Sequence, residues 1–378
     1  MLRLKLVRVL VVHHSLNTVG GAERLCLNVM EALKGAGHKV TLASLEKPDW
    51  GRVRRAFGRS VEVESRYVLP FRLRMFGIYQ RPLTGLVAQA LRGGADMIVN
   101  THGDLMPCHA DLTYMHYPVL ALGLERGSKY TSSPFWRLYF TPYELSQRVM
   151  LRMFLKRGVI ATNSTFSAEA VRKFLGVPAV VVHPPVDVET FHVERSKDPR
   201  LVLTVGRYSP EKRFDLVPRV ARRCRGLRFI VAGSLTPRGE VYLRRLREEA
   251  RRLGAGNVEF LADVPLGELR SLYGEASAYL HLMVNEHFGI SVVEAMASGC
   301  IPVVHRSGGT WRDILAEGRY GLGYRSLDEC VEALEKVYKG EFEELREEVR
   351  ERAWDFSEDR FKSRFIHVFD RVASLKEG

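Results

Sequence analysis

The 378-residue sequence lacks several features that mark common classes of protein. Its five cysteines are scattered and show no C-x2-C spacing, which argues against a zinc site or a disulfide framework and favours a reducing compartment. No uninterrupted apolar run approaches the length of a membrane span. The short apolar run at residues 9–12 is followed by His13 and His14 without a small-residue cleavage site, so a first β-strand fits it better than a signal peptide.

Two cofactor signatures are missing as well. No G-x-G-x-x-G fingerprint follows the first predicted strand, which argues against a nicotinamide or flavin enzyme. No Asp-x-Asp pair offers an evident metal site. We therefore expect neither a cofactor nor a required metal.

What the chain does contain is apolar sequence for two domains and an excess of positive charge. Its length exceeds that of one ordinary domain, and its 46% hydrophobic content indicates folded domains rather than disorder. The formal net charge of +13 requires an anionic partner or surface as its explanation. Nucleic acid, anionic lipid and a phosphorylated substrate are the candidates.

The first half of the chain predicts a doubly wound α/β domain. An apolar strand at residues 6–12 is followed by Gly20 and Gly21, by a helix with apolar spacing at residues 22–34, and by a second strand at residues 40–43. Taken alone, the two glycines fit a plain turn.

Two histidines of this half follow predicted strands. His102 comes after the strand at residues 95–100, and His116 opens a His-Tyr-Pro turn at the end of the strand at residues 112–118. The carboxyl ends of parallel strands face the ligand crevice, so both histidines are candidates for it. Taken alone, either one is more often a structural residue.

Two segments of the first half combine basic and aromatic residues. Residues 52–81 carry eight arginines against two glutamates, and residues 120–160 carry seven basic residues against two acidic ones. Such segments suit the headgroup layer of an anionic membrane, single-stranded nucleic acid, or a solvated basic face over core aromatics. Because the basic residues are spread through both predicted domains without a nucleic-acid motif, we expect no nucleic-acid partner.

A second α/β domain is predicted after a stiff, proline-containing linker at residues 186–199. Its first strand ends at Arg207, and a loop carrying Lys212 leads into a helix that begins at Phe214. Fixed cations at this place would stabilise negative charge on a departing phosphate. A basic loop at a helix start is the simpler alternative.

The stretch at residues 285–300 dominates this second half. Residues 291–298 predict a helix that follows a strand-like run and a tight turn, and Gly299 fits its C-terminal cap. This arrangement brings backbone N–H groups and the positive helix end together, which suits a phosphate. Glu286 lies at the mouth of the turn and Glu294 lies within the helix, so we expect the two carboxylates to share a ligand. Sugar hydroxyls need acceptors and phosphate needs donors, so the pattern predicts a phosphate-linked sugar. Ordinary surface glutamates are the alternative.

The spacing of Glu286 and Glu294 resembles the E-x7-E motif of the retaining glycosyltransferases of the GT-B fold, family 4. Residues 285–290, Asn-Glu-His-Phe-Gly-Ile, and residues 305–309, His-Arg-Ser-Gly-Gly, are most similar to the branch that holds the α-1,2-mannosyltransferase of the dolichol-linked oligosaccharide. The resemblance implies two Rossmann-like doubly wound domains that face each other across a cleft, with the last helix crossing back to the first domain. The expected parts are an acceptor-binding domain, a linker, a nucleotide-sugar-binding domain and the returning helix, at residues 1–185, 186–199, 200–356 and 357–378.

The same resemblance implies roles for individual residues. Arg207 and Lys212 would contact the donor diphosphate, and Glu294 would hold the ribose hydroxyls. Glu286, which would hold the sugar hydroxyls, and His116, near the transferred sugar or the acceptor, are the predicted catalytic residues. The other expected substrate contacts are Gly20, Gly21, His287, Phe288, Gly289 and Ile290.

We therefore expect a hexosyltransferase that moves mannose from GDP-mannose, with retention of configuration, to a lipid-linked or phospholipid acceptor. Because the basic aromatic segments lie in the acceptor-binding half, we expect a peripheral protein on an anionic membrane surface, at the cytoplasmic face. A soluble acceptor with a UDP- or ADP-sugar donor is the alternative within the same class. A catalytically silent GT-B partner subunit and a basic nucleic-acid-binding protein are alternatives of other classes. The oligomeric state stays open.

Overall fold

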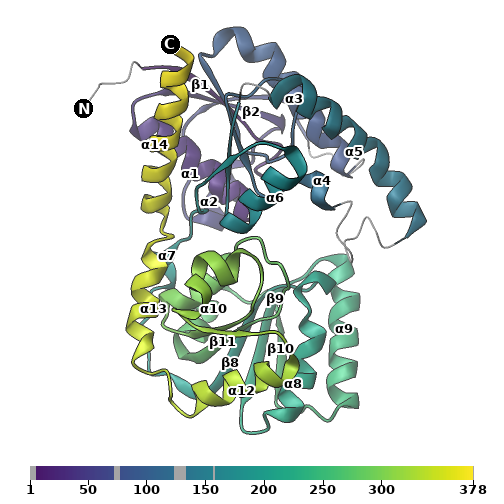
Figure 1. The fold of residues 1–378 in the computed structure, drawn as a ribbon, viewed down its shortest axis with the longest axis vertical. Coiled ribbons are helices and arrows are strands. Elements are labelled where there is room, and N and C mark those ends of the chain that lie inside the picture. The colour runs from purple at the N-terminus through teal and green to yellow at the C-terminus, as the bar shows by residue number, and fades with distance from the viewer. Residues whose placement is uncertain (1–5, 72–76, 123–132, 156–157, 378) are drawn as a thin grey trace. The chain divides into compact units, whose positions relative to one another are not determined.

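The computed structural model describes residues 6–71, 77–122, 133–155 and 158–377, and the chain divides into two compact units (Figure 1). The first unit comprises Met1–Pro185 together with Asp359–Gly378, and the second comprises Val186–Glu358. Each unit contains one parallel sheet with helices between most of its consecutive strands, the arrangement that alternating strand and helix patterns predict.

The first unit contains a seven-stranded sheet in the order β3-β2-β1-β4-β5-β6-β7. All of its strand pairs are parallel. The strand order reverses between β1 and β4, which makes their carboxyl ends the expected ligand-binding edge. Its strands are β1 (Arg8–Val12), β2 (Lys39–Glu46), β3 (Glu64–Leu69), β4 (Met97–Asn100), β5 (Leu112–Met115), β6 (Val159–Thr162) and β7 (Ala179–Val181). Its helices are α1 (Gly21–Gly35), α2 (Trp50–Phe57), α3 (Gln80–Leu91), α4 (Val119–Leu122), α5 (Pro134–Phe154), α6 (Thr165–Leu175) and α14 (Glu358–Glu377), with 3-10 turns η1 (Gly77–Tyr79) and η2 (Arg92–Gly94).

The second unit contains a six-stranded sheet in the order β10-β9-β8-β11-β12-β13, again with parallel pairs. Here the order reverses between β8 and β11. Its strands are β8 (Asp198–Arg207), β9 (Arg228–Ser234), β10 (Val258–Ala262), β11 (Ala276–His281), β12 (Ile301–His305) and β13 (Leu322–Tyr324). Its helices are α7 (Val188–Phe191), α8 (Val217–Arg223), α9 (Pro237–Arg252), α10 (Leu266–Glu275), α11 (Ile290–Ala297), α12 (Leu327–Tyr338) and α13 (Leu345–Trp354), with short turns η5 (Pro210–Lys212), η6 (Phe214–Leu216), η7 (Thr310–Ile314) and η8 (Ala316–Gly318).

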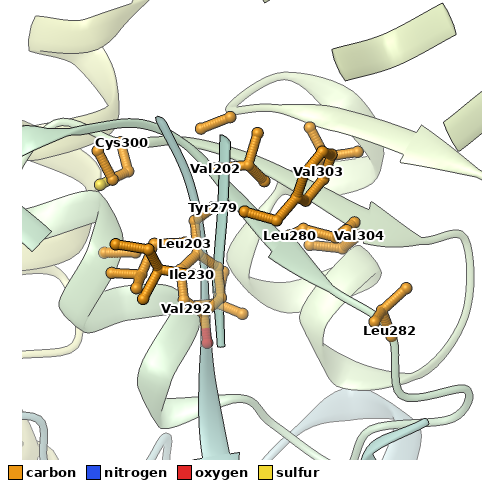
Figure 2. Packing of buried hydrophobic residues seen from close by; sticks show 14 of the residues in the cluster. Val202, Leu203, Ile230, Tyr279, Leu280, Leu282, Val292, Cys300, Val303 and Val304 are labelled. Atoms are coloured by element: carbon orange, nitrogen blue, oxygen red, sulfur yellow. The ribbon is translucent and has the colours of Figure 1, made fainter. Parts of the chain in front are cut away.

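The core of the second unit lies between its sheet and the surrounding helices. Figure 2 shows side chains of β8, β11 and β12 packed with Val292 of α11. Leu203, Leu280 and Val303, one from each of these strands, are completely buried. Such burial on both faces of a parallel sheet explains the nearly continuous apolar runs that predicted these strands.

The last helix, α14, completes the first unit. Its apolar stripe at Phe361, Phe365 and Phe369 lies in the main buried cluster of that unit. Lys362 of α14 pairs with Glu31 of α1 at 2.8 Å. Truncating a side chain as fully buried as Phe365 costs about 3–5 kcal/mol, so we expect the first unit to depend on this helix.

Residues 186–199 do not form the predicted linker. Val186 and Phe191 are buried in the core of the second unit, and Asp187 accepts a hydrogen bond from the Thr190 N–H at 3.1 Å at the start of α7. β8 already begins at Asp198. Prolines and charged residues dominate the sequence pattern, but the apolar side chains between them bury enough surface to order the segment.

The first basic aromatic segment is not a single amphipathic element. Residues 52–81 contain most of α2, all of β3 and the start of α3, and residues 72–76 lie outside the described part of the chain. Residues 123–132 and 156–157 of the second segment also lie outside it, whereas α5 is described. Within the described part of the chain, every helix is too short or too polar to span a bilayer.

Candidate active site

Three neighbouring strands of the second unit end close to the residues that the sequence singled out. β8 ends at Arg207, β11 at His281 and β12 at His305, and these strands are adjacent in the sheet. The loops after β8 and β11 supply Lys212 and Glu286. These loops therefore meet where the strand order reverses, the usual ligand-binding place of an open parallel sheet.

Glu286 forms a largely buried ion pair with Lys212. Lys212 Nζ lies 2.6 Å from Glu286 Oε2, and the two side chains are 20% and 13% exposed. His281 Nε2 lies 3.3 Å from the same oxygen. Burial alone would raise the pKa of Glu286, but the contact with His281 and the charge of Lys212 lower it well below its ordinary value. Glu286 is therefore ionised near neutral pH, while burial lowers the pKa of His281 and favours its neutral form.

The loop after β12 holds the backbone of Glu286. The Gly309 N–H donates to the Glu286 carbonyl oxygen at 2.8 Å, and the Asn285 N–H donates to Ser307 Oγ at 2.8 Å. A Cβ on Gly308 would lie 2.3 Å from the Glu286 carbonyl oxygen, and Gly308 has a φ of +73°. Both observations require glycine at position 308. The loop after β12 therefore packs directly against the backbone of the loop that carries Glu286 and holds it in place.

Residues 287–290 connect Glu286 to α11. The Phe288 side chain is 3% exposed and packs edge to face on Phe356, with 5.5 Å between ring centroids. Gly289 has a φ of +108°, and a Cβ there would lie 2.8 Å from Thr310 Oγ1. The buried Phe288 side chain thus anchors the loop, and the substrate contact expected of this residue stays a prediction. His287 and Ile290 are half-buried.

Glu294 lies on α11 and accepts a hydrogen bond from the Tyr273 hydroxyl at 3.0 Å. Beside it, the Tyr279 hydroxyl lies 2.8 Å from Ser291 Oγ. Burial raises the pKa of Tyr279, and the charges of both Glu294 and Glu286 add to that increase. Both carboxylates therefore lie within electrostatic range of one buried phenol, which is consistent with a shared ligand.

Arg207 differs from Lys212 in its surroundings. Its side chain is 68% exposed, and its guanidinium lies 3.8 Å from the Glu211 carboxylate. An exposed pair at that distance is weak. A ligand could therefore recruit Arg207 at little cost, whereas it would have to draw Lys212 away from Glu286.

In the first unit, Gly20 is the N-cap residue of α1 and Gly21 is the first residue of that helix. The Gly20 N–H donates to Glu23 Oε2 at 2.6 Å, and His13 Nε2 lies 3.8 Å from Glu23 Oε1. Burial alone would lower the pKa of His13, but Cys26 and Glu23 raise it to about 10. Burial would likewise raise the pKa of Glu23, but His13 lowers it to about 2. A buried imidazolium–carboxylate pair therefore holds the glycine turn.

Four histidines gather at the carboxyl ends of β1, β4 and β5. The ring centroid of His102 lies 5.9 Å from that of His13 and 5.3 Å from that of His14. Burial lowers the pKa of His102 well below its ordinary value, and the charges of Arg81 and of the other three histidines, His116 included, lower it further. His102 is therefore neutral near pH 7, and both predicted candidates, His102 and His116, lie in this cluster.

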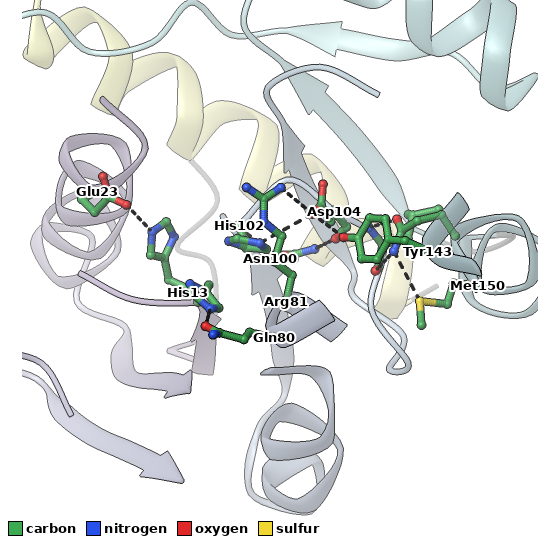
Figure 3. A network of polar contacts seen from close by, with 12 residues as sticks. His13, Glu23, Gln80, Arg81, Asn100, His102, Asp104, Tyr143 and Met150 are labelled. Carbon is green, nitrogen blue, oxygen red and sulfur yellow. Dashed lines mark hydrogen bonds and ion pairs between the residues drawn. The ribbon is translucent and has the colours of Figure 1, made fainter. Parts of the chain in front are cut away.

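Asp104 organises the polar groups beside His102 (Figure 3). Its Oδ2 accepts hydrogen bonds from Arg81 Nη1 at 2.9 Å and from the Tyr143 hydroxyl at 2.6 Å. His102 Nε2 lies 3.7 Å from the same oxygen. Since Arg81 belongs to α3 and Tyr143 to α5, both helices contribute to this edge of the sheet.

Sequence reasoning missed some of the residues at the strand ends of each unit. His13 and His14 directly follow the first predicted strand, so the rule that selected His102 and His116 could also have selected them. His281 lies within a strand, and its contact with Glu286 has no local sequence signal. The same holds for Tyr273 and its hydrogen bond to Glu294.

The arrangement in the second unit combines cations with carboxylates at one strand edge. Lys212 and Arg207 can neutralise a diphosphate, and Glu286 and Glu294 can accept hydrogen bonds from hydroxyl groups. Within the described residues, no group of three or more His, Cys, Asp and Glu side chains could hold a metal ion.

Family models match both units of the chain. The model described as glycosyltransferase family 4 matches residues 19–190, and the model described as glycosyl transferases group 1 matches residues 185–355. Between them they include every site residue that the sequence predicted. The chain belongs to glycosyltransferase family 4.

Several curated relatives of this family 4 chain carry the name GDP-Man:Man(3)GlcNAc(2)-PP-Dol alpha-1,2-mannosyltransferase. The Homo sapiens protein is 26% identical over 296 residues, which cover 69% of this chain and 60% of the relative. The Dictyostelium discoideum protein is 24% identical over 289 residues, covering 67% and 57% respectively. The chain therefore matches less than two thirds of the length of these relatives.

Solved structures show the same fold. Sucrose-phosphate synthase from Thermosynechococcus elongatus superposes with a TM-score of 0.75 at 16% identity, covering 98% of this chain and 100% of that one. A glycosyltransferase from Rickettsia africae has a TM-score of 0.71 at 12% identity, covering 97% and 99%. With the two doubly wound parallel sheets, this likeness shows the GT-B glycosyltransferase fold of the family.

Proposed function

We propose that the protein is a retaining mannosyltransferase that uses GDP-mannose as donor and a lipid-linked oligosaccharide as acceptor. The observation that supports this most is the Lys212–Glu286 ion pair at the carboxyl edge of the second sheet. It presents a cation and a carboxylate where a phosphate-linked sugar needs one of each. The names of the curated relatives add the identity of the donor and the class of the acceptor.

In the proposed reaction, the second unit binds the donor. Lys212 leaves Glu286 and, with Arg207, contacts the diphosphate. Glu286 then accepts hydrogen bonds from the sugar hydroxyls, and Glu294 accepts them from the ribose hydroxyls. As the bond between the sugar C1 and the phosphate oxygen breaks, negative charge grows on the departing phosphate, and the two cations stabilise it.

The acceptor hydroxyl attacks C1 from the side on which the phosphate leaves, so the anomeric configuration is retained. The new bond joins the acceptor oxygen to C1, and the hydroxyl proton passes to the departing phosphate oxygen. In this proposal His116 and the neutral His102 orient the acceptor hydroxyl by hydrogen bonding. No further base is required, because the phosphate accepts the proton.

A transfer assay tests this function. The protein is incubated with GDP-[14C]mannose and Man3GlcNAc2 on a pyrophosphate-linked isoprenoid, and the label in the organic phase is counted. We expect labelled lipid, with Glu286→Gln lowering the rate about 100-fold or more. Transfer from UDP-glucose or ADP-glucose instead would contradict the donor. Label on free Man3GlcNAc2 but none on the lipid-linked form would contradict the acceptor class.

We also propose that the protein binds an anionic membrane surface through α5, at the cytoplasmic face. Exposed apolar side chains recur on this helix at intervals of three, seven, four and four residues, which places them on one face. They are Phe135, Leu138, Leu145, Val149 and Met153, each between 48% and 76% exposed. Arg137 and Arg152 are exposed on the same helix and suit anionic headgroups. The five cysteines are all free and buried, which fits a reducing compartment.

Vesicle sedimentation tests the membrane surface. We expect the protein to sediment with phosphatidylserine-containing vesicles and much less with phosphatidylcholine alone. The double variant Leu138→Asp/Leu145→Asp should lower the bound fraction about ten-fold. The matched control is Leu266→Asp on α10 of the second unit, where the leucine is 54% exposed. If the double variant on α5 bound the vesicles as strongly as the Leu266→Asp control, that result would contradict the role of α5.

A further inference from the structure

A pocket of about 400 Å³ lies at the carboxyl edge of the sheet in the first unit. It is lined by residues that follow β1, β2 and β3, namely Asn17, Lys47, Asp49, Trp50 and Phe71, together with two prolines. A volume of this size falls within the range of small-molecule sites. The pocket takes no part in the reaction described above.

Hydrogen bonds hold the polar wall of this pocket in place. The Lys47 N–H donates to the Leu69 carbonyl oxygen at 2.8 Å, which ties the end of β2 to the end of β3. The Asn17 side chain donates to the Lys47 carbonyl oxygen at 3.0 Å and accepts from the Asp49 N–H at 2.8 Å. It also donates to Glu46, a 2% exposed carboxylate, at 3.3 Å. The wall is therefore preformed.

The side chains of the pocket suit a pyranose ring. Trp50 packs partly against the core of the unit, which fixes its indole, and Phe71 is 61% exposed. Aromatic faces of this kind pack against the C–H faces of a sugar. Lys47 can donate hydrogen bonds to hydroxyl oxygens and Asp49 can accept them from hydroxyl protons. Because the charges of Lys47 and Asp49 offset each other, the pocket has little net attraction for a phosphate and suits a neutral hydroxylated ring.

The loop after β1 connects this pocket with the histidine cluster. His14 belongs to the cluster, Asn17 lines the pocket, and only two residues separate them. Between them, Ser15 Oγ donates to Glu46 Oε2 at 2.7 Å. An acceptor with several sugar rings could therefore extend along one edge of the sheet and meet both places.

We propose that this pocket is a subsite for one neutral pyranose ring of the acceptor oligosaccharide. The inference rests on the proposed function, because it presumes an acceptor that carries several sugars. Trp50 and Phe71 pack against the ring, and Lys47 and Asp49 bind its hydroxyls. The ring so bound is distinct from the sugar whose hydroxyl reacts near His116.

Fluorine NMR of 5-fluorotryptophan-labelled protein tests the subsite directly. The chain has four tryptophans, Trp50, Trp136, Trp311 and Trp354, and Trp50→Phe assigns the first resonance. The probe is free Man3GlcNAc2, without lipid or donor. We expect the Trp50 resonance to shift and to saturate, while the other three stay in place. No shift of Trp50 up to about 10 mM probe, or a shift of Trp311 or Trp354 instead, would overturn the proposal.

Kinetics with the lipid-linked form provide the second readout. Trp50→Phe and Lys47→Met should each raise the KM for the acceptor about ten-fold and leave the KM for GDP-mannose within about two-fold. Asp49→Asn should do the same, and asparagine can still accept the hydrogen bond from the Arg52 N–H that Asp49 accepts at 2.9 Å. The control is Lys39→Met, at the exposed opposite end of β2, which should change neither constant.

The two proposals fail in different ways. A shifting Trp50 in a protein that transfers no mannose would support the subsite and contradict the proposed function. Transfer of mannose with a silent Trp50 and an unchanged acceptor KM in the variants would overturn the subsite alone.

Discussion

At the carboxyl edge of the second sheet, Lys212 and Glu286 form a pair of fixed charges, whereas the same edge of the first sheet carries four histidines. The pKa of Glu286 lies far below neutrality, so the second edge keeps its charge pattern throughout the physiological range. At the first edge, burial and neighbouring cations lower the pKa values of His14 and His102 and leave neutral imidazoles. The first edge thus suits hydroxyl groups, and the second suits a charged nucleotide.

Each edge also contains a buried ion pair beside a glycine turn, but the two pairs differ. Glu23 interacts with the Gly20 N–H as well as with His13, so its charge is satisfied within the turn. Glu286 shares Oε2 between Lys212 and His281. We infer that the first pair is structural, while the second is opened by the donor.

The largest effect is expected at Glu286. Glu286→Gln removes an acceptor for sugar hydroxyls and leaves Lys212 without its counter-charge, so kcat/KM for transfer should fall about 10²–10³-fold. Steady-state kinetics with GDP-mannose measure this loss of kcat/KM. Glu329→Gln is the control, because the Glu329 side chain is 40% exposed and pairs with Arg306 at 3.6 Å. A loss below ten-fold in the Glu286 variant would remove the distinction between the two edges.

A smaller effect is expected in the first unit, at His116. His116→Asn should lower kcat about 100-fold without changing GDP-mannose affinity, because in the proposed reaction the histidine acts on the acceptor. His109→Asn is the matched control. His109 lies shortly before β5, at the opposite end of that strand, and its Nδ1 lies 3.1 Å from the Phe154 carbonyl oxygen. If both variants kept full activity, the histidine cluster would have no catalytic role.

Arg207 should matter less than Lys212. In the proposed reaction Arg207 contacts the diphosphate, and its side chain is 68% exposed, so the interaction is screened by solvent. Arg207→Ala should therefore weaken GDP-mannose binding about ten-fold. Arg200→Ala, at the exposed opposite end of the same strand, should leave binding unchanged. Titration calorimetry distinguishes the two variants. Equal affinities would place the diphosphate away from the end of β8.

The smallest effect concerns stability and pH. The pKa of His13 rises from 6.5 to about 10 on folding, so its stabilising contribution is complete below pH 6.5 and is lost as the pH rises toward 10. The pKa of Glu23 falls from 4.5 to about 2, so its contribution is complete above pH 4.5 and is lost as the pH falls toward 2. The pair therefore stabilises the first unit most between pH 4.5 and 6.5.

We expect His13→Gln to lower the unfolding temperature by about 5 °C at pH 6 and by progressively less toward pH 10. Thermal unfolding of the variant and of the unmodified protein, followed at several pH values, measures this difference. Parallel curves for the variant and the unmodified protein would mean that His13 is not charged in the folded state.

The sequence predicted those parts of the site that lie close together along the chain. Glu286 and Glu294 belong to one strand-turn-helix pattern, and Arg207 and Lys212 to another. The contact between Lys212 and Glu286 joins residues 74 positions apart. It exists because β8 and β11 are neighbours in the sheet, and strand order is not encoded in any local pattern.

Local sequence patterns do not encode tertiary contacts, and this also explains where the structure differs from the sequence-based predictions. Alternating strands and helices predicted two doubly wound domains, since that pattern follows from burial on both faces of a parallel sheet. The ordered segment at residues 186–199 depends on the core of the second unit, and the histidine cluster depends on three strands meeting at one edge. Both are consequences of tertiary packing.

Titration calorimetry with GDP-mannose, UDP-glucose and ADP-glucose, without added metal, tests the central claim most directly. The account predicts that GDP-mannose binds the unmodified protein and that binding is lost in Lys212→Met and strongly weakened in Glu294→Ala. It also predicts that the other two nucleotide sugars bind at least about ten-fold more weakly. GDP-mannose binding that both variants retain, or preferential binding of UDP-glucose or ADP-glucose, would contradict the account.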